Sequence, residues 1–410
     1  MDIWFIGKEH SLCKYFLFQK NIMKVLHLNS LDSGGAAKAV DRINCSLNKK
    51  INSEIFFFKD KNKFFRNFLS KPYSIADKII SRLNNKIKNT TFSSNLVPFS
   101  FIPFIIKKKN PDLVHLHWIN AGMISINDLL KIKKPIVWTM HDYWPFSGGY
   151  HYPVNNMHSN NPLDIKIFKK KKEVYNKIKN IIFIAVSRKL MEEAKKSSLL
   201  INKNISFINN PLNNKFFNKK NKIDCRNRIG LNDKFSILFC SNNSVYKENK
   251  NFHFLVKVLN KFSEINEVNF IICGERRNVK ENFDFSNRIN VIETGFTNSE
   301  KELSVIYNAA DLTIVPSKKE AFGQVASESF ACGTPVIGIK NTGLDDIIVH
   351  RENGYLCNEA NIDEFLNAIK WIQIQNKETI IKRCQSSILK FSYENISNQY
   401  IEIYKKILNQ

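Results

Sequence analysis

The stretch KKEAFGQVASESFACGTPVIG, residues 318–338, decides the fold. It connects two short apolar runs, DLTIVPS (311–317) and PVIGI (335–339). A helix beginning near Gln324 and ending at Gly333 is expected between them, because glycine is favoured directly after the last turn of a helix. Two short apolar strands joined by a helix form one unit of a parallel sheet.

Similar apolar runs recur through the rest of the chain. The first half contains MKVLHLNS (23–30), DLVHLHW (112–118), PIVWTMHD (135–142), NIIFIAVS (180–187) and ISFINNP (205–211). The second half adds FSILFCS (235–241), NFIICGE (269–275) and INVIETG (289–295). Helical stretches separate most of these runs, which is typical of parallel sheets covered by helices on both faces. The sequence therefore predicts an α/β fold.

The length of 410 residues is too great for a single hydrophobic core. We expect two doubly wound, Rossmann-like domains, residues 23–210 and 211–390, with the polar stretch NNPLNNKFFNKKNK (209–222) at their junction. Residues 391–410 form a separate amphipathic C-terminal helix. The first strand starts at Met23, so residues 1–22 are treated as an N-terminal extension. They are a mis-assigned start, an interfacial segment or a genuine extension.

Cysteine usage and the apolar pattern indicate a cytoplasmic protein. The eight cysteines are scattered and include no CxxC pair, which argues against a disulfide framework or a zinc knuckle. The N-terminus has no continuous apolar run, so no signal peptide is expected. The most apolar stretches, such as FSFIPFII (99–106), are too short to span a bilayer.

Positive charge is concentrated in the first half of the chain. Residues 1–210 hold 35 Lys+Arg against 14 Asp+Glu, and the whole chain carries a formal net charge of +25. These lysines either cover a solvated face or contact an anionic partner, for which a membrane leaflet, a phosphorylated substrate and nucleic acid are the candidates. No nucleic-acid-binding motif is present, so no nucleic-acid partner is expected.

The lysine-rich segment KIFKKKKEVYNKIKN (166–180) has a helical apolar spacing. The apolar positions are Ile165, Phe168, Val174, Tyr175 and Ile178. They either bury one face of a helix or meet lipid headgroups. The second interpretation predicts peripheral, salt-sensitive contact with the anionic inner face of the cytoplasmic membrane, without a spanning segment.

Glu320 and Glu328 mark a candidate ligand site in the second domain. In open α/β sheets, ligands bind beyond the carboxyl ends of the strands, where Glu320 and the start of the next helix should lie. The helix N-terminus suits a phosphate, and Gly323 allows the backbone to approach it. Eight helical residues rise about 12 Å, so the two acids can face hydroxyl groups on either side of a diphosphate. The alternative is a solvated loop acid and a helix acid paired with a lysine.

Residues 311–356 resemble the E-x7-E segment of retaining glycosyltransferases of family 4, which have the two-domain GT-B fold. The resemblance extends over nearly the whole chain from Met23. VLHLNSLDSGGAAKAVDRI resembles the first strand and glycine loop of that family, and DLVHLHW and PIVWTMHDYWPFSGGYHY resemble a branch that builds bacterial surface polysaccharides. AVSRKL, INNPLNNKFF and the final helix also fit. The resemblance implies two sheets facing across a cleft, with the C-terminal helix packing back on the N-terminal domain.

In the second domain the resemblance assigns roles by position. Glu320 would contact the donor sugar as a catalytic residue, and Glu328 would bind the ribose. The amides around Phe322, Gly323, Gln324 and Val325 would meet the diphosphate. These implied roles would place a nucleotide-sugar site at the N-terminus of the helix that begins near Gln324.

The basic residue of the family's Lys-Gly pair falls on Lys250, but Asn251 replaces the glycine. A partner arginine often follows the first strand of this domain. Here Ser241-Asn242-Asn243 stands there instead, and Lys247 is a candidate substitute. Both departures concern the groups that would hold the diphosphate.

In the first domain the resemblance points to Gly34, Gly35 and His141. The glycine pair would form a loop over the donor phosphates, although a plain turn fits the residues equally well. His141 would be the active-site histidine, which orients and polarises the donor sugar. The leaving phosphate would accept the proton of the acceptor, so no separate catalytic base is needed.

A metal site is a further alternative in the first domain. His115 and His117 project from the same side of a strand, and His141, Asp142 and His151 lie nearby in the sequence. Histidines satisfied by hydrogen bonds are the commoner case, so we expect no metal and no cofactor. Tyr150 occupies the place where the related branch often has a cysteine after its glycine pair.

The function expected from these residues is transfer of a sugar, with retention, from a nucleotide-sugar donor. The acceptor would be a glycan or a polyprenyl-linked glycan of a bacterial capsule, O-antigen or exopolysaccharide. A nucleotide-sugar epimerase, a phosphorylase on the same fold and a catalytically silent binding subunit are the alternatives. The sequence does not specify the donor sugar, the nucleotide base, the acceptor, the linkage or the oligomeric state.

Overall fold

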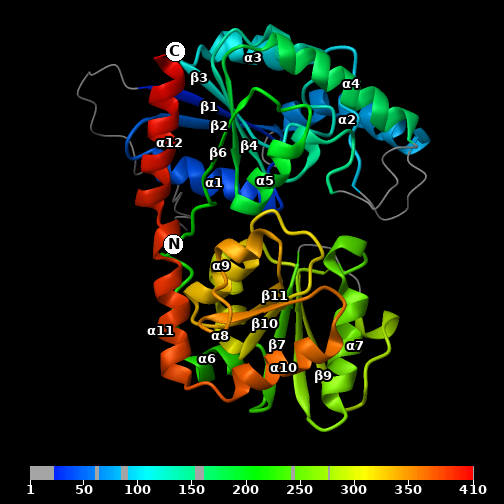
Figure 1. Cartoon of the computed structure of the whole chain (residues 1–410), viewed down its shortest axis with the longest axis vertical. Helices are drawn as coiled ribbons and strands as arrows, with labels where there is room; N and C mark the ends of the chain where they lie inside the picture. The colour runs from blue at the N-terminus through cyan, green and yellow to red at the C-terminus, as the bar shows by residue number, and fades with distance from the viewer. Residues whose placement is uncertain are drawn as a thin grey trace, which may run out of the picture.

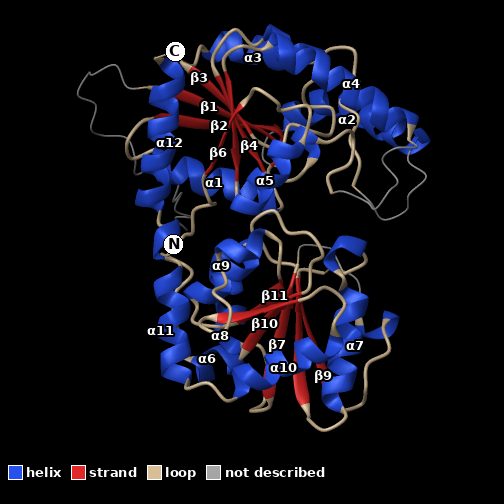
Figure 2. Cartoon of the chain, viewed as in Figure 1, coloured by secondary structure: helices blue, strands red, loops and turns tan. Residues whose placement is uncertain are grey.

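A computed structural model describes residues 23–60, 64–84, 91–152, 161–241, 245–275 and 278–409. The chain forms two α/β domains, one above the other along the long axis of the molecule (Figure 1). In each domain the strands form a central layer and the helices lie outside it (Figure 2). The predicted extension, residues 1–22, lies outside the described residues.

The first domain contains a six-stranded sheet with the order β2-β1-β3-β4-β5-β6. All its pairs are parallel. Its strands are β1 (Lys24–Leu31), β2 (Asn52–Lys59), β3 (Leu113–Leu116), β4 (Ile136–Met140), β5 (Ile181–Ala185) and β6 (Asn204–Phe207). Its helices are α1 (Gly35–Leu47), α2 (Phe64–Asn84), α3 (Ile102–Lys109), α4 (Pro162–Lys177) and α5 (Arg188–Lys196).

The second domain contains a six-stranded parallel sheet with the order β12-β11-β10-β7-β8-β9. Its strands are β7 (Phe235–Cys240), β8 (Val268–Cys273), β9 (Ile289–Gly295), β10 (Leu312–Val315), β11 (Val336–Ile339) and β12 (Gly354–Cys357). Its helices are α6 (Lys222–Arg228), α7 (Phe252–Ser263), α8 (Glu300–Ala309), α9 (Gln324–Ala331), α10 (Ile362–Gln373) and α11 (Lys377–Ser387).

The two predicted doubly wound parallel sheets are confirmed. All ten predicted strands are present, and the decisive stretch folds as expected into β10, α9 and β11. The prediction missed β2 and β12, which lie at the edge of their sheets. The other two edge strands, β6 and β9, were predicted, so edge position alone does not explain the two omissions.

The C-terminal helix, α12 (Tyr393–Leu408), returns to the first domain as predicted (Figure 1). Tyr400 and Tyr404 are fully buried in one apolar cluster with Val25 and Val137 of the first sheet. The Tyr404 hydroxyl also lies 2.7 Å from Nδ1 of His115. The helix therefore completes the core of the N-terminal domain.

The lysine-rich segment 166–180 is a packed helix, not a lipid-facing one. Val174 and Tyr175 of α4 are fully buried. Lys171 is also buried and donates to the carbonyl oxygen of Gly148 at 2.7 Å. Of the five apolar positions, Ile165 is exposed. The apolar stripe thus belongs mainly to the core, as the first of the two alternatives predicts.

Candidate functional site

A pocket of about 430 Å³ opens between the two domains, at the carboxyl ends of both sheets. The order of the second sheet reverses between β7 and β10, and the order of the first reverses between β1 and β3. Residues that follow these strands line the pocket, including Ser241, Ser317 and Trp118. Such reversal points are where open α/β sheets bind ligands.

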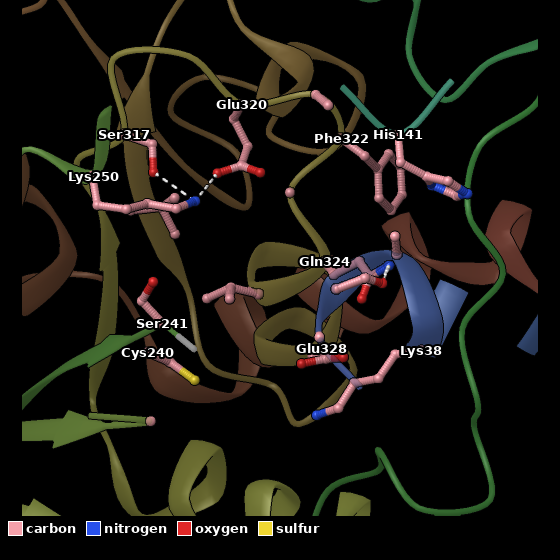
Figure 3. Close-up of a pocket in the computed structure, with 18 of the residues that line it drawn as sticks. Lys38, His141, Cys240, Ser241, Lys250, Ser317, Glu320, Phe322, Gln324 and Glu328 are labelled. Carbon is pink, nitrogen blue, oxygen red and sulfur yellow. Dashed lines mark hydrogen bonds and ion pairs between the residues drawn. The ribbon is translucent and has the colours of Figure 1, made fainter. Parts of the chain in front are cut away.

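Two helices begin at this pocket, one from each domain. Gly34 and Gly35 lie at the start of α1, and Gly323 caps the start of α9. The Gln324 side chain donates to the carbonyl oxygen of Gly35 at 3.2 Å and so bridges the domains (Figure 3). Two helix N-termini that meet at one pocket favour an anion there.

Gly323 is required by both conformation and space. Its φ is +104°, a region that other residues rarely adopt, and a β-carbon would lie 2.4 Å from Cδ2 of Leu344. Phe322, Gln324 and Val325, the other predicted backbone contacts, line the same pocket. The structure therefore brings all the predicted diphosphate-binding residues of this loop to one place.

Glu320 and Lys250 form an ion pair on the wall of the pocket. The Lys250 ammonium lies 2.8 Å from Oε2 of Glu320 and 3.3 Å from Oγ of Ser317 (Figure 3). Asn251, which replaces the family's glycine, has a φ of +53°. Asparagine is among the few residues that tolerate this left-handed conformation, so the substitution preserves the loop that presents Lys250.

Further cations surround the pocket. Lys38 of α1 and Lys247 line it together with Lys250. Burial and the neighbouring Lys250 lower the pKa of Lys247 from its ordinary value. That Lys247 substitutes for the partner arginine stays a prediction. Residues 242–244, where that arginine was expected, lie outside the described residues.

Glu328 lies in the second turn of α9, and its side chain is buried. Its Oε2 accepts a hydrogen bond from the Tyr307 hydroxyl at 2.9 Å. Its Oε1 accepts from Nη2 of Arg42 at 2.6 Å. The alternative interpretation paired Glu328 with a lysine. Its cationic partner is instead Arg42 of the other domain. Sequence reasoning missed Arg42 because nothing local in α1 links it to a residue 286 positions away.

His141 lines the pocket from the first domain and is the end of a chain of histidines. Its Nε2 lies 3.0 Å from Nδ1 of His117, and Nε2 of His117 lies 2.9 Å from Nδ1 of His27. Burial lowers the pKa of His141 to about 4. His141 is therefore neutral at physiological pH and suited to hydrogen bonding rather than to proton transfer.

The other candidate metal ligands separate into two groups. Asp142 bonds to Nδ1 of His151 at 2.6 Å and to the Trp118 indole at 3.0 Å, away from His141. The ligand atoms of His27, His115 and His117 lie within 4.8 Å of one another. Sequence reasoning missed His27, although it occupies the first strand at the same register as His115.

Neighbouring side chains already engage the nitrogens of this histidine cluster. His115 contacts Tyr404 and, at 2.8 Å, the Thr139 hydroxyl, while both nitrogens of His117 face other histidines. Among the described residues, Nε2 of His27 has no partner. The cluster is thus held by hydrogen bonds, and the absence of a metal stays a prediction.

The histidine chain predicts which tautomer His141 adopts. An unpaired buried N–H costs about 1–3 kcal/mol, so the proton of neutral His27 should sit on Nδ1, not on the unpartnered Nε2. His27 then donates to His117, which donates to Nε2 of His141 and leaves the proton of His141 on Nδ1. ¹⁵N NMR of histidine-labelled protein should show this tautomer from about pH 6 to 8. A titration of His141 within that range, or an Nε2–H tautomer, would contradict the assignment.

Comparison with known proteins identifies two family models, one on each domain. The model described as "Glycosyltransferase Family 4" matches residues 33–215, and the one described as "Glycosyl transferases group 1" matches residues 221–383. A Klebsiella pneumoniae protein described as "Uncharacterized 41.2 kDa protein in cps region" is 25% identical over 402 residues, covering 93% of this chain and 99% of that protein. An uncharacterized glycosyltransferase of Methanocaldococcus jannaschii is 28% identical over 191 residues, covering 45% of this chain and 48% of that protein.

Solved structures share the whole fold. Sucrose-phosphate synthase from Thermosynechococcus elongatus superimposes with a TM-score of 0.71 at 17% identity, covering 94% of this chain and 99% of that one. Anabaena HepE in complex with UDP-glucose has a TM-score of 0.65 at 18% identity, covering 94% and 100%. The predicted GT-B fold is confirmed by these likenesses. With the two family models matching one domain each, the chain belongs to the family 4 glycosyltransferases and is a transferase enzyme of the GT-B fold.

Proposed function

We propose that this enzyme transfers a sugar from a nucleotide-sugar donor, with retention, onto a glycan or polyprenyl-linked glycan of a bacterial cell-surface polysaccharide. The observation that carries the proposal is the single pocket lined by Lys250, by two helix N-termini and by the carboxylates of Glu320 and Glu328. The Klebsiella relative from a cps region and the UDP-glucose complex of HepE support it.

The pocket offers different chemistry to each part of such a donor. Lys250 and the free amides of α1 and α9 suit the diphosphate, whose charge grows as the bond to the sugar breaks. Glu328 suits the ribose hydroxyls and Glu320 the sugar hydroxyls, since ionised carboxylates only accept hydrogen bonds. His141, neutral at working pH, orients the sugar. The leaving phosphate takes the proton of the attacking hydroxyl on the same face, which gives retention.

A nucleotide-release assay separates this function from the alternatives. Thermal stabilisation by a panel of UDP-, GDP- and ADP-sugars first identifies the donor, because a bound ligand raises stability by mass action. A transferase then releases the nucleoside diphosphate faster when a glycan acceptor is added. An epimerase leaves the donor nucleotide attached, a phosphorylase requires inorganic phosphate, and a silent subunit binds donor without release. Any of these three outcomes would contradict the proposal.

We predict that the activity needs no divalent ion. Lys250 and the two helix N-termini supply positive charge at the pocket, and no DxD-type acidic pair precedes the donor site in the sequence. Turnover after treatment with EDTA and desalting should stay within about twofold of the untreated enzyme. A loss of turnover that one particular metal restores would contradict this prediction. The candidate metal site would then be His27, His115 and His117.

We further propose that the N-terminal domain contacts an anionic membrane through α2, α3 and the segment leading into α3. Tyr73 of α2 packs against Phe99, with 6.0 Å between the ring centroids, so the two elements share one surface. The exposed apolar residues of these elements are Phe68, Ile75, Ile79, Phe99 and Phe104. Exposed lysines accompany them at positions 71, 78 and 107–109. No helix within the described ranges is long and apolar enough to cross a bilayer.

Vesicle co-sedimentation tests this membrane contact. Each lysine near an anionic surface contributes about 1 kcal/mol, so the protein should sediment with anionic vesicles at low salt and be released at high salt. The double variant Phe68→Ser/Phe104→Ser should bind several-fold more weakly. Ile374→Ser, which removes an equally exposed apolar side chain from the second domain, is the matched control. Protein that stays in the supernatant at low salt would contradict the proposal.

A further inference from the structure

Arg42 is a buried cation that joins the two domains at the donor pocket. It belongs to α1 of the first domain, and only 2% of its side chain is exposed. Its Nη2 lies 2.6 Å from Oε1 of Glu328, and its Nε donates to Oε1 of Glu300 at 2.8 Å. Both carboxylates belong to the second domain. The guanidinium therefore reaches across the domain boundary and holds two acids at once.

The surroundings of Arg42 fix its position. Asn213 donates to the second oxygen of Glu300 at 2.8 Å, and the ring of Phe217 lies 5.2 Å from the guanidinium carbon. Nevertheless, Nη1 of Arg42 is buried with no partner among the described residues. A buried ion pair with an unsatisfied donor contributes little net stability. This arrangement is better explained by what it does to Glu328.

Two hydrogen-bond donors, one from each domain, hold the Glu328 carboxylate in place. Arg42 occupies one lone pair of Oε1, and the Tyr307 hydroxyl occupies one of Oε2. Each carboxylate oxygen has a second lone pair, so one acceptor position on each oxygen is free for a ligand. Two parallel acceptors match two adjacent hydroxyls, as on a ribose. Since one of the two holding groups comes from the other domain, this geometry exists only when the domains are together.

We propose that Arg42 is a positioning residue, which couples recognition of the ribose by Glu328 to closure of the two domains. The inference rests on the proposed function, because it takes a nucleotide as the ligand. It assigns Arg42 no contact with the donor itself. Arg42 acts through the orientation of the Glu328 carboxylate, and Glu300 anchors it from the other side.

The test measures how strongly the enzyme prefers ribonucleotides over deoxynucleotides. Calorimetric binding of UDP, GDP and ADP selects the tightest ligand, which is then compared with its 2′-deoxy counterpart. The wild-type enzyme should prefer the ribonucleotide by about tenfold or more, since the 2′-hydroxyl pairs with a buried carboxylate. In Arg42→Gln this preference should fall to about twofold, close to its value in Glu328→Gln.

Two further variants make the result specific. Arg188→Gln removes another interdomain ion pair, in which Nε of Arg188 lies 3.8 Å from Oδ1 of Asp346. Neither residue lines the pocket, so this variant should keep the full preference. Glu300→Gln leaves the Arg42 contact with Glu328 in place but weakens its anchor, so the preference should fall only partly. Glu300→Gln also carries the test if Arg42→Gln does not fold, as judged by circular dichroism.

The outcomes separate this inference from the proposed function. If Arg42→Gln weakens binding of the ribo- and deoxynucleotide equally, Arg42 has only a structural role and the inference is wrong. If the wild-type enzyme binds none of the three nucleotides, the proposed function fails first. If the preference falls as much in Arg188→Gln as in Arg42→Gln, closure alone is responsible and the specific role of Arg42 is wrong.

Discussion

Replacing Lys250 by methionine should lower kcat by about 10²–10³-fold while leaving the fold intact. Methionine keeps the length of the side chain but removes the cation that faces the pocket 2.8 Å from Glu320. Removing a preorganised group that stabilises developing charge typically costs this much. The effect should appear mainly in kcat, because charge accumulates on the leaving diphosphate in the transition state.

Lys318→Met is the matched control for this measurement. Lys318 lies on the neighbouring loop and pairs with Glu248 at 3.4 Å, but neither residue lines the pocket. This variant should keep wild-type turnover within about twofold, as expected for an exposed ion pair. Near-normal kcat in Lys250→Met would show that the diphosphate leaves without help from this residue and would overturn its assignment.

Glu320→Gln should lower turnover about tenfold to hundredfold. In the proposed role the carboxylate accepts hydrogen bonds from the donor sugar, and leaving a partner unpaired there costs about 1–3 kcal/mol. Glutamine preserves the shape but also releases Lys250 from its ion pair. Binding of the free nucleoside diphosphate should therefore be retained or tightened while sugar transfer falls. This opposite response of binding and turnover distinguishes a catalytic role from general damage to the site.

Calorimetry with the nucleoside diphosphate and a steady-state transfer assay together measure both quantities. Glu248→Gln, which changes an exposed acid on the neighbouring loop, should alter neither. Wild-type turnover in Glu320→Gln, or a parallel loss of nucleotide binding and turnover, would contradict the role assigned to Glu320.

The fold was predictable because each parallel strand is a short, continuous apolar run. Val114 and Ile314 lie in strands that are buried on both faces, and such strands have an unmistakable composition. The two missed strands, β2 and β12, each pair with a single neighbouring strand, β1 and β11, and only this pairing identifies them as strands. The same limit left the role of α4 open, since the lysine-rich pattern did not reveal that Lys171 faces the core.

The candidate site was predictable only where it is local in sequence. The loop from Glu320 to Gln324 and its helix form one continuous motif, so their shared location follows from the strand–loop–helix pattern. Arg42, Tyr307 and His27 reach the site or its supporting chain through tertiary contacts between distant segments. No periodicity or spacing links such residues, and each pair becomes visible only once the two sheets are placed in space.

A crystal structure of the enzyme with the nucleoside diphosphate that stabilises it most tests the central claim directly. The account predicts that the diphosphate lies between the starts of α1 and α9 within reach of Lys250. It also predicts that both ribose hydroxyls lie within hydrogen-bond distance of the Glu328 carboxylate, with Glu320 facing the site of the missing sugar. A nucleotide bound elsewhere, or one in this pocket with its ribose turned away from Glu328, would contradict it.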